Sequence, residues 1–189
     1  MTTLGNISIK SSEKNTSRLY DVVFTNSAEF GIIDQRDFFD RNIANDHSIQ
    51  GYYVVYPNNY VYNPRISTIA PVGPINRNKL SYAGVMSPLY YVFKITDKET
   101  SFLFLDHYFK STIWHEFMYL NGNSGARSDR FSISDKSFAE LPIIKPKEQR
   151  EQISIGRFME NYDKEISYSE MKLSKVRNMK QALLQKMFV

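Results

Sequence analysis

The segment from Val61 to Asn78, with the sequence VYNPRISTIAPVGPINRN, has an unusual set of polar side chains. It contains three prolines, three asparagines and two arginines, and its only charges are positive. Asparagine and arginine carry planar groups that pair bidentately with adenine and guanine, and a stiff loop loses little entropy on binding. This combination predicts a loop that reads base edges. The candidate DNA contacts are Arg65, Asn76, Arg77, Asn78 and Lys79.

The surroundings of this loop are depleted in acids. Between His47 and Thr96 no Asp or Glu occurs, whereas four basic residues do. A carboxylate near a phosphate weakens binding, so an acid-free stretch suits a polyanionic ligand. Strand-forming sequence is poor in acids in any case, and this second explanation stays open. For Arg65 an alternative to DNA binding also stays open: the segment YNPRIS would shape the fold, and Arg65 would form an internal ion pair.

A second polar loop extends from Asn121 to Ser134 and has the sequence NGNSGARSDRFSIS. Its glycines favour turns, and its arginines and serines can contact a nucleic acid. Ser124, Arg127 and Arg130 are therefore added to the candidate DNA contacts.

The chain lacks the motifs of catalytic chemistry. It has no Gly-rich phosphate loop, no methyl-donor loop and no Asn-Pro-Pro-aromatic motif of amino-methyltransferases. Glu170 and Lys172 match half of a nuclease metal motif, but they lie in a helical segment where Glu and Lys are common surface residues. The three histidines have no metal-binding spacing, and cysteine is absent. We therefore expect no catalysis by this chain, no cofactor and no metal.

Length and composition predict one core with an appendage, or two small domains. The chain has 189 residues, of which 13 are Tyr, 13 are Phe and one is Trp. Residues 1–144 hold equal numbers of basic and acidic side chains, so the net charge of +4 lies in residues 145–189. No apolar run approaches the roughly 20 residues of a membrane span, and the N-terminus lacks a signal-peptide core. These features predict a cytoplasmic protein.

The elements that position the loops are predicted from periodicity. Residues Leu19–Ser27, the two flanks of the Pro57–Asn59 turn and the segment 84–95, interrupted at Pro88, predict short strands. Residues 34–42 predict a short helix or loop. Apolar residues at 102, 105, 109, 113, 117 and 120 predict one amphipathic helix with Trp114 beside its core face. Prolines exclude a central strand or helix from segment 61–78, which is expected to be a stiff loop.

The end of the chain predicts a long helix that begins near Pro146. Positions taken alternately four and three residues apart from Ile155 to Met187 are apolar in eight of ten cases. The eight are Ile155, Met159, Tyr162, Ile166, Leu173, Val176, Leu183 and Met187. This spacing is typical of a coiled-coil seam, and roughly 60 Å of helix is too long to cover that seam with its own domain. We expect a partner helix from another chain, with a helix folded back on its own domain as the alternative.

Four segments closely resemble the specificity subunit of Type I restriction–modification systems. They are TNSAEFGIIDQRDFF, YVYNPRISTIAPVGPINRN, GVMSPLYYVFK and the tail from LPIIKPKEQREQ to LLQKMF. The resemblance extends from about Leu4 to Phe188, and the tail is its most specific part. It implies an α+β fold, with a target recognition domain over residues 1–144 and a long coiled-coil helix over residues 145–189.

The resemblance also implies partners. In that family a subunit carries two target recognition domains, each followed by a long helix, and the two helices pack antiparallel. Each domain reads half of a bipartite DNA sequence, the methylation subunits carry the methyl-donor site, and the restriction subunit joins afterwards. This chain has one domain and one helix, so it resembles half a subunit, either naturally encoded or part of a longer one. The expected partners are double-stranded DNA, a second copy or the other half, and the methylation and restriction subunits, with no membrane.

A different class of function fits the same helix. A coiled-coil assembly or adaptor protein would use the helix as its main interface and bind protein through its head domain. The acid-free stretch and the two arginine-bearing loops count against this alternative. A steep salt dependence of binding to random duplex DNA would distinguish the two, because phosphate contacts release counterions.

Overall fold

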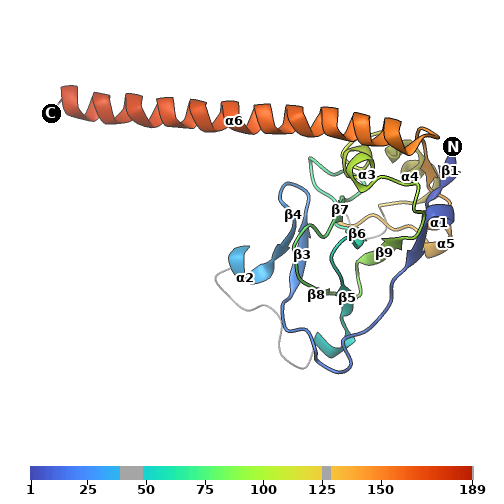
Figure 1. Cartoon of the computed structure of the whole chain (residues 1–189). Helices are drawn as coiled ribbons and strands as arrows, with labels where there is room; N and C mark the ends of the chain where they lie inside the picture. The colour runs from blue at the N-terminus through green and yellow to red at the C-terminus, as the bar shows by residue number, and fades with distance from the viewer. Residues whose placement is uncertain (39–48, 125–128, 189) are drawn as a thin grey trace.

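The computed structural model describes residues 1–38, 49–124 and 129–188 and shows a mixed α+β protein. Strands and short helices make up the N-terminal part, and one long helix follows it (Figure 1). The predicted order of a sheet-rich part and a C-terminal helix is confirmed. Part of the element predicted at 34–42, together with His47 and Arg127, lies outside the described residues.

The largest sheet is antiparallel and has four strands. In spatial order they are β2 (Ser8–Lys10), β9 (Tyr91–Ile95), β6 (Tyr60–Tyr62) and β7 (Ile75–Arg77). The central strands β9 and β6 are rich in Val, Tyr and Phe, which suit a buried pleated surface. In the register of the sheet, Val61 lies between Val92 of β9 and Asn76 of β7.

Three further antiparallel pairs surround this sheet. They are β1 (Thr2–Thr3) with β10 (Pro142–Ile143), β3 (Phe24–Ser27) with β4 (Gly31–Asp34), and β5 (Tyr53–Val55) with β8 (Gly84–Met86). The short helical turns are α1 (Leu4–Ile7), α2 (Gln35–Phe38), η1 (Ile49–Gly51) and α5 (Asp135–Ala139). The strands predicted on either side of Pro57–Asn59 both form, but in different sheets. Asn58 allows this change of direction with a φ of 66°, which asparagine tolerates better than most residues.

The proline-rich segment is not a loop throughout, which corrects the expectation from sequence. Val61 and Tyr62, ahead of the first proline, belong to the central strand β6, and Ile75–Arg77, directly after Pro74, forms the edge strand β7 and pairs with β6. Proline excludes a central strand, but an edge strand needs hydrogen bonds on one side only. The Pro74 carbonyl oxygen also accepts the backbone N–H of Asn63 at 2.9 Å. The last part of the segment therefore holds its side chains in fixed directions.

Aromatic rings fill the main core, which explains their abundance in the chain. Tyr60 and Phe93 stack with centroids 5.4 Å apart. Phe109 packs edge-on against Tyr60, and Phe138 packs edge-on against Phe93. Trp114 is buried and donates its indole N–H to the Phe109 carbonyl oxygen at 3.2 Å. The prediction of Trp114 as a core residue is confirmed.

The prediction of a single helix over residues 102–120 is wrong. The chain instead forms α3 (Phe102–Tyr108) and α4 (His115–Asn121). Ser111 bonds back to the Tyr108 carbonyl oxygen at 2.7 Å, and a β-branched pair follows it, so the helix stops there. Ile113 and Leu120 are consequently exposed, although the helical spacing placed both on a core face. His107 and His115 lie on separate helices.

The C-terminal helix α6 extends from Gln149 to Met187, or 39 residues, and spans about 58 Å at 1.5 Å per residue. Glu148 precedes its first turn and Glu151 lies within it, where the helix dipole favours acids. Figure 1 shows α6 passing over the domain at α3 and continuing beyond it. Every residue from 161 to 188 is exposed. The helix is therefore not buried against its own domain over residues 161–188, although Asp163 still contacts the domain through Lys110. Among the described residues, no helix combines the length and apolar character that crossing a membrane requires.

Two buried residues fix the start of α6 to α3. The Gln152 side chain is fully buried and accepts the backbone N–H of Ser101 at 2.9 Å. Its amide donates to two backbone carbonyl oxygens at 3.2 and 2.9 Å. Gly156 lies against Leu103, where an added Cβ would come within 2.9 Å of a backbone carbon. The absence of a side chain at Gly156 therefore sets how closely the helix approaches the domain.

We expect Gly156→Val to lower the free energy of unfolding by about 1–3 kcal/mol, because the new side chain overpacks a backbone contact. Ser154→Val is the matched control, since Ser154 is exposed on the same helical turn. Urea denaturation of both variants measures the difference. Equal stability of the two variants would show that the approach of α6 to α3 does not depend on Gly156.

Candidate nucleic-acid interface

The two candidate DNA-binding loops meet through their backbones. The N–H of Ile66 donates to the Asp129 carbonyl oxygen at 3.1 Å, and the N–H of Phe131 donates to that of Pro64 at 2.7 Å. Arg65 and Arg130 form an antiparallel bridge between these two bonds. The structure therefore brings together two loops that the sequence could only identify separately.

The bridge places the side chains of Arg65 and Arg130 next to each other. Because the flanking residues make the hydrogen bonds, the two arginines are a non-hydrogen-bonded pair, the type with Cα atoms about 4.5 Å apart. Directly opposite side chains project from the same face, and successive residues alternate between faces. The neighbouring Phe131 is buried in the core. The two arginines accordingly project away from the core.

The two arginines differ in their ionic partners, because Arg130 has an ion pair with Asp129 and Arg65 has none within the described residues. Arg65 is exposed and has no ion pair within the described residues. The Arg130 side chain is 29% exposed, and its Nε lies 3.9 Å from the Asp129 carboxylate, beyond hydrogen-bond distance. Ser124 is also exposed in the same loop, whereas Arg127 lies outside the described residues. Arg65, Arg130 and Ser124 are thus placed where a large ligand can reach them.

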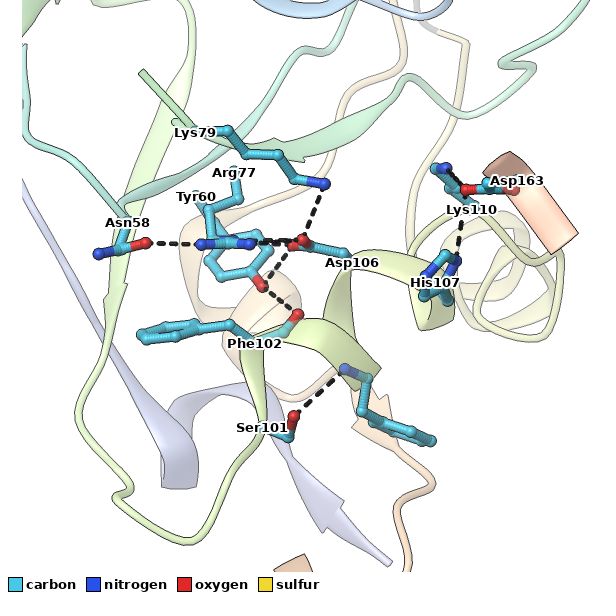
Figure 2. A network of polar contacts seen from close by, with 11 residues as sticks. Asn58, Tyr60, Arg77, Lys79, Ser101, Phe102, Asp106, His107, Lys110 and Asp163 are labelled. Carbon is cyan, nitrogen blue, oxygen red and sulfur yellow. Dashed lines mark hydrogen bonds and ion pairs between the residues drawn. The ribbon is translucent and has the colours of Figure 1, made fainter. Parts of the chain in front are cut away.

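Arg77 is placed differently, inside a network of polar contacts (Figure 2). Its guanidinium donates from Nε and Nη2 to the Asp106 carboxylate, at 3.0 and 2.7 Å, and from Nη1 to the Asn58 side-chain oxygen at 2.6 Å. It also lies over the Phe102 ring, 5.2 Å from the centroid. Only 16% of the Arg77 side chain is exposed.

Asp106 is the centre of this network. Its side chain is 5% exposed and also accepts the Tyr60 hydroxyl at 2.9 Å. The Lys79 ammonium lies 3.0 Å from the same carboxylate, but 62% of the Lys79 side chain remains exposed (Figure 2). Burial by itself raises the pKa of Asp106, yet the hydrogen bonds and charges of Arg77 and Lys79 outweigh it and hold that pKa below its ordinary value. Lys79 therefore remains within reach of a ligand, whereas Arg77 is committed to the fold.

The asparagines of the proline-rich segment also bond internally. Asn76 donates to the side-chain oxygen of Asn26 at 2.8 Å. Asn78 is fully buried, donates to the carbonyl oxygens of Val55 and Tyr82, and accepts the N–H of Leu80.

The expectation that Asn76, Arg77 and Asn78 extend from an exposed loop is therefore corrected. The strands here are short, and polar backbone groups at their ends need partners that a side-chain amide can supply. A DNA contact by the Arg77 guanidinium or the buried Asn78 amide would require the present internal bonds to open.

Polar contacts also join α3 to α6. Lys110 donates to the Asp163 carboxylate at 2.7 Å, and His107 lies 3.9 Å from the same carboxylate (Figure 2). Burial, followed by the charge of Lys110, lowers the pKa of His107, so its imidazole is neutral at pH 7. The predicted seam extends along α6 on both sides of Asp163 and is exposed at each of its eight apolar positions. These are Ile155, Met159, Tyr162, Ile166, Leu173, Val176, Leu183 and Met187.

Sequence reasoning missed the importance of Asp106. A signal was present, because Asp106 is the only acid in the apolar run from Ser101 to Phe109, and a buried carboxylate needs a cationic partner. Two cations in the preceding acid-free segment, Arg77 and Lys79, supply it. Sequence spacing alone does not select them from the other basic residues.

No cluster of His, Cys, Asp and Glu that could bind a metal ion occurs among the described residues. The structure shows an arginine pair, an exposed lysine and a long helix with an exposed apolar face. Comparison with known proteins gives no match, either to a family model or to a curated protein.

Proposed function

We propose that this protein recognises DNA as half of a specificity subunit in a Type I restriction–modification complex. The observation that carries the proposal is the meeting of the two loops, which places Arg65 beside Arg130 on an outward face. Like charges directly opposite each other destabilise a strand pair, and an anionic ligand removes that cost. The resemblance of the sequence and the exposed helix are its further support.

The seam of α6 supports a second copy of the same helix as its partner. Its ten positions are spaced symmetrically about residue 171, so in an antiparallel pair each position meets another seam position. Ile155 then faces Met187, Met159 faces Leu183, Tyr162 faces Lys180, Ile166 faces Val176, and Ser169 faces Leu173. Each of the two polar positions thereby meets a large apolar side chain, so no layer of the seam is wholly polar.

A parallel pair is less favourable for the same sequence. In a parallel arrangement with helices in register, identical positions face each other, so Lys180 would meet Lys180 of the second copy. Two ammonium groups in one layer repel each other and lose water. We therefore propose a coiled coil of two antiparallel α6 helices, which separates the two head domains by a distance that the helix length sets.

The proposed partners follow from the resemblance of the sequence to a Type I specificity subunit. The methylation subunits supply the methyl donor site and dock on the domain and helix, and the restriction subunit joins the complex. This chain by itself transfers no methyl group and cleaves no DNA. Because an antiparallel pair has a two-fold axis, the proposed target is an interrupted palindrome, with half-sites roughly 34 Å or somewhat more apart on the duplex.

Duplex binding at two salt concentrations tests the function. We expect the chain to bind random duplex DNA and to lose at least tenfold in affinity between about 50 and 200 mM salt, because several phosphate contacts are made. Salt-independent binding, or none at low salt, would favour the adaptor protein instead. Selection from a random duplex pool with the methylation partner present should then recover a palindrome. A non-palindromic site would mean that the other half differs.

A further inference from the structure

We propose that Arg65 and Arg130 form one clamp for a single phosphate of the DNA backbone. This inference rests on the proposed function and assigns the role that these two residues have within it. These two arginines position the protein on the duplex, whereas other residues select the base sequence.

The side chains of Arg65 and Arg130 lie close enough to bind one anion together. Two guanidinium groups start from opposite residues of one narrow bridge, so both can reach the same small anion. Guanidinium forks match the tetrahedral oxygens of phosphate, and two of them can share its oxygens. A guanine edge, in contrast, is satisfied by one arginine, which would leave the second cation beside it without a partner.

The local surroundings agree with a fixed clamp. The N–H of Arg65 donates to the Asn63 side-chain oxygen at 2.9 Å, and Asn63 in turn donates to the Asn26 carbonyl oxygen at 2.8 Å. Arg65 therefore starts from a backbone position that buried asparagines hold in place. The Asp129 carboxylate forms an ion pair with Arg130 at 3.9 Å, but it is 56% exposed and beyond hydrogen-bond distance, so a phosphate can replace it at the Arg130 guanidinium.

Salt dependence distinguishes one shared phosphate from two separate ones. Each neutralised phosphate contributes about 0.9 to the slope of log affinity against log salt concentration. We expect Arg65→Ala/Arg130→Ala to lower this slope by about one and to weaken binding of random and selected duplexes alike. Arg65→Lys/Arg130→Lys should keep most of the slope. Arg157→Ala removes an exposed arginine of α6 and is the control that leaves the slope unchanged.

The outcomes separate this inference from the function on which it rests. If the wild-type chain binds no duplex at low salt, the proposed function fails, and the clamp fails with it. If it binds and the double alanine variant has the same slope, only the clamp is wrong. A slope lowered by about two means two separate phosphates, and a change in the selected sequence means a base contact. Circular dichroism shows whether the alanine variant folds. If it does not, Arg65→Gln/Arg130→Gln removes both charges, keeps polar side chains and carries the test, with the same expected loss of about one in the slope.

Discussion

Asp106→Ala is expected to destabilise the protein by about 3–5 kcal/mol, because it leaves Arg77 buried without its ionic partner. The carboxylate also accepts the Tyr60 hydroxyl, which would lose its acceptor within the core. Urea denaturation followed by circular dichroism measures the change. For a marginally stable domain, a loss of this size removes a large part of the folding free energy.

The control for this prediction is Lys79→Ala. Lys79 contacts the same carboxylate, but its side chain is 62% exposed, so its loss should cost no more than about 1 kcal/mol. Replacing both buried partners, in Arg77→Leu/Asp106→Leu, should cost less than Asp106→Ala because no uncompensated charge remains. An Asp106→Ala variant as stable as Lys79→Ala would show that the network does not support the fold.

The same ion pair gives the stability a defined dependence on pH. The hydrogen bonds and charges that outweigh burial hold the pKa of Asp106 below its ordinary value in the folded protein. Such a group contributes stability above its unfolded pKa of about 3.9 and loses that contribution as the pH falls through the folded pKa. The stability difference between wild type and Asp106→Asn should therefore be constant above about pH 5 and shrink below about pH 4. A difference that persists down to about pH 2 would assign the effect to shape and not to charge.

Leu173→Glu/Val176→Glu is expected to convert a dimer into monomers. Both residues lie near the middle of the α6 seam and are half-exposed in the single chain, at 49% and 56%. In the antiparallel pair, two new carboxylates from each chain would be buried without partners, at several kcal/mol each. The dimer dissociation constant should rise at least a thousandfold, which corresponds to about 4 kcal/mol. Light scattering at micromolar concentration should give the mass of two chains for wild type and of one chain for the variant.

Tyr168→Glu/Met171→Glu is the matched control for the seam. These two residues are similarly exposed, at 58% and 63%, and lie on the same helix but outside the four-three spacing. These two substitutions should leave the protein a dimer, so light scattering should still give the mass of two chains. A wild-type chain with the mass of one chain would rule out the homodimer. Dissociation by both pairs of substitutions would mean that the interface is not limited to the predicted seam.

The sequence by itself determined the long helix and its exposed seam. An α-helix is held by hydrogen bonds between residues four apart, and a seam repeats every few residues, so both are visible in a short window. The length of α6 then required much of the seam to lie beyond the domain. The short strands around Tyr60 and Val85 were predicted for the same reason, since alternation and turn residues are local signals.

The partners of the polar side chains were decided only by the tertiary structure. Local sequence predicted one helix over residues 102–120, but the chain forms two helices, and the buried Trp114 lies at the break between them. Asn76 and Asn78 resembled base-reading residues by composition, yet their amides donate to backbone carbonyl oxygens, that of Ser27 at the end of β3 and that of Tyr82. Arg77 meets Asp106 across 29 residues.

Arg65 meets Arg130 through a bridge between two loops that are far apart in the chain. An ion pair or a bridge depends on which segments the core brings together, and neither has a period along the chain. The residue types could therefore be read from the sequence. Which arginine is exposed and which is buried against an acid depends on contacts between distant segments, and only the folded chain contains them.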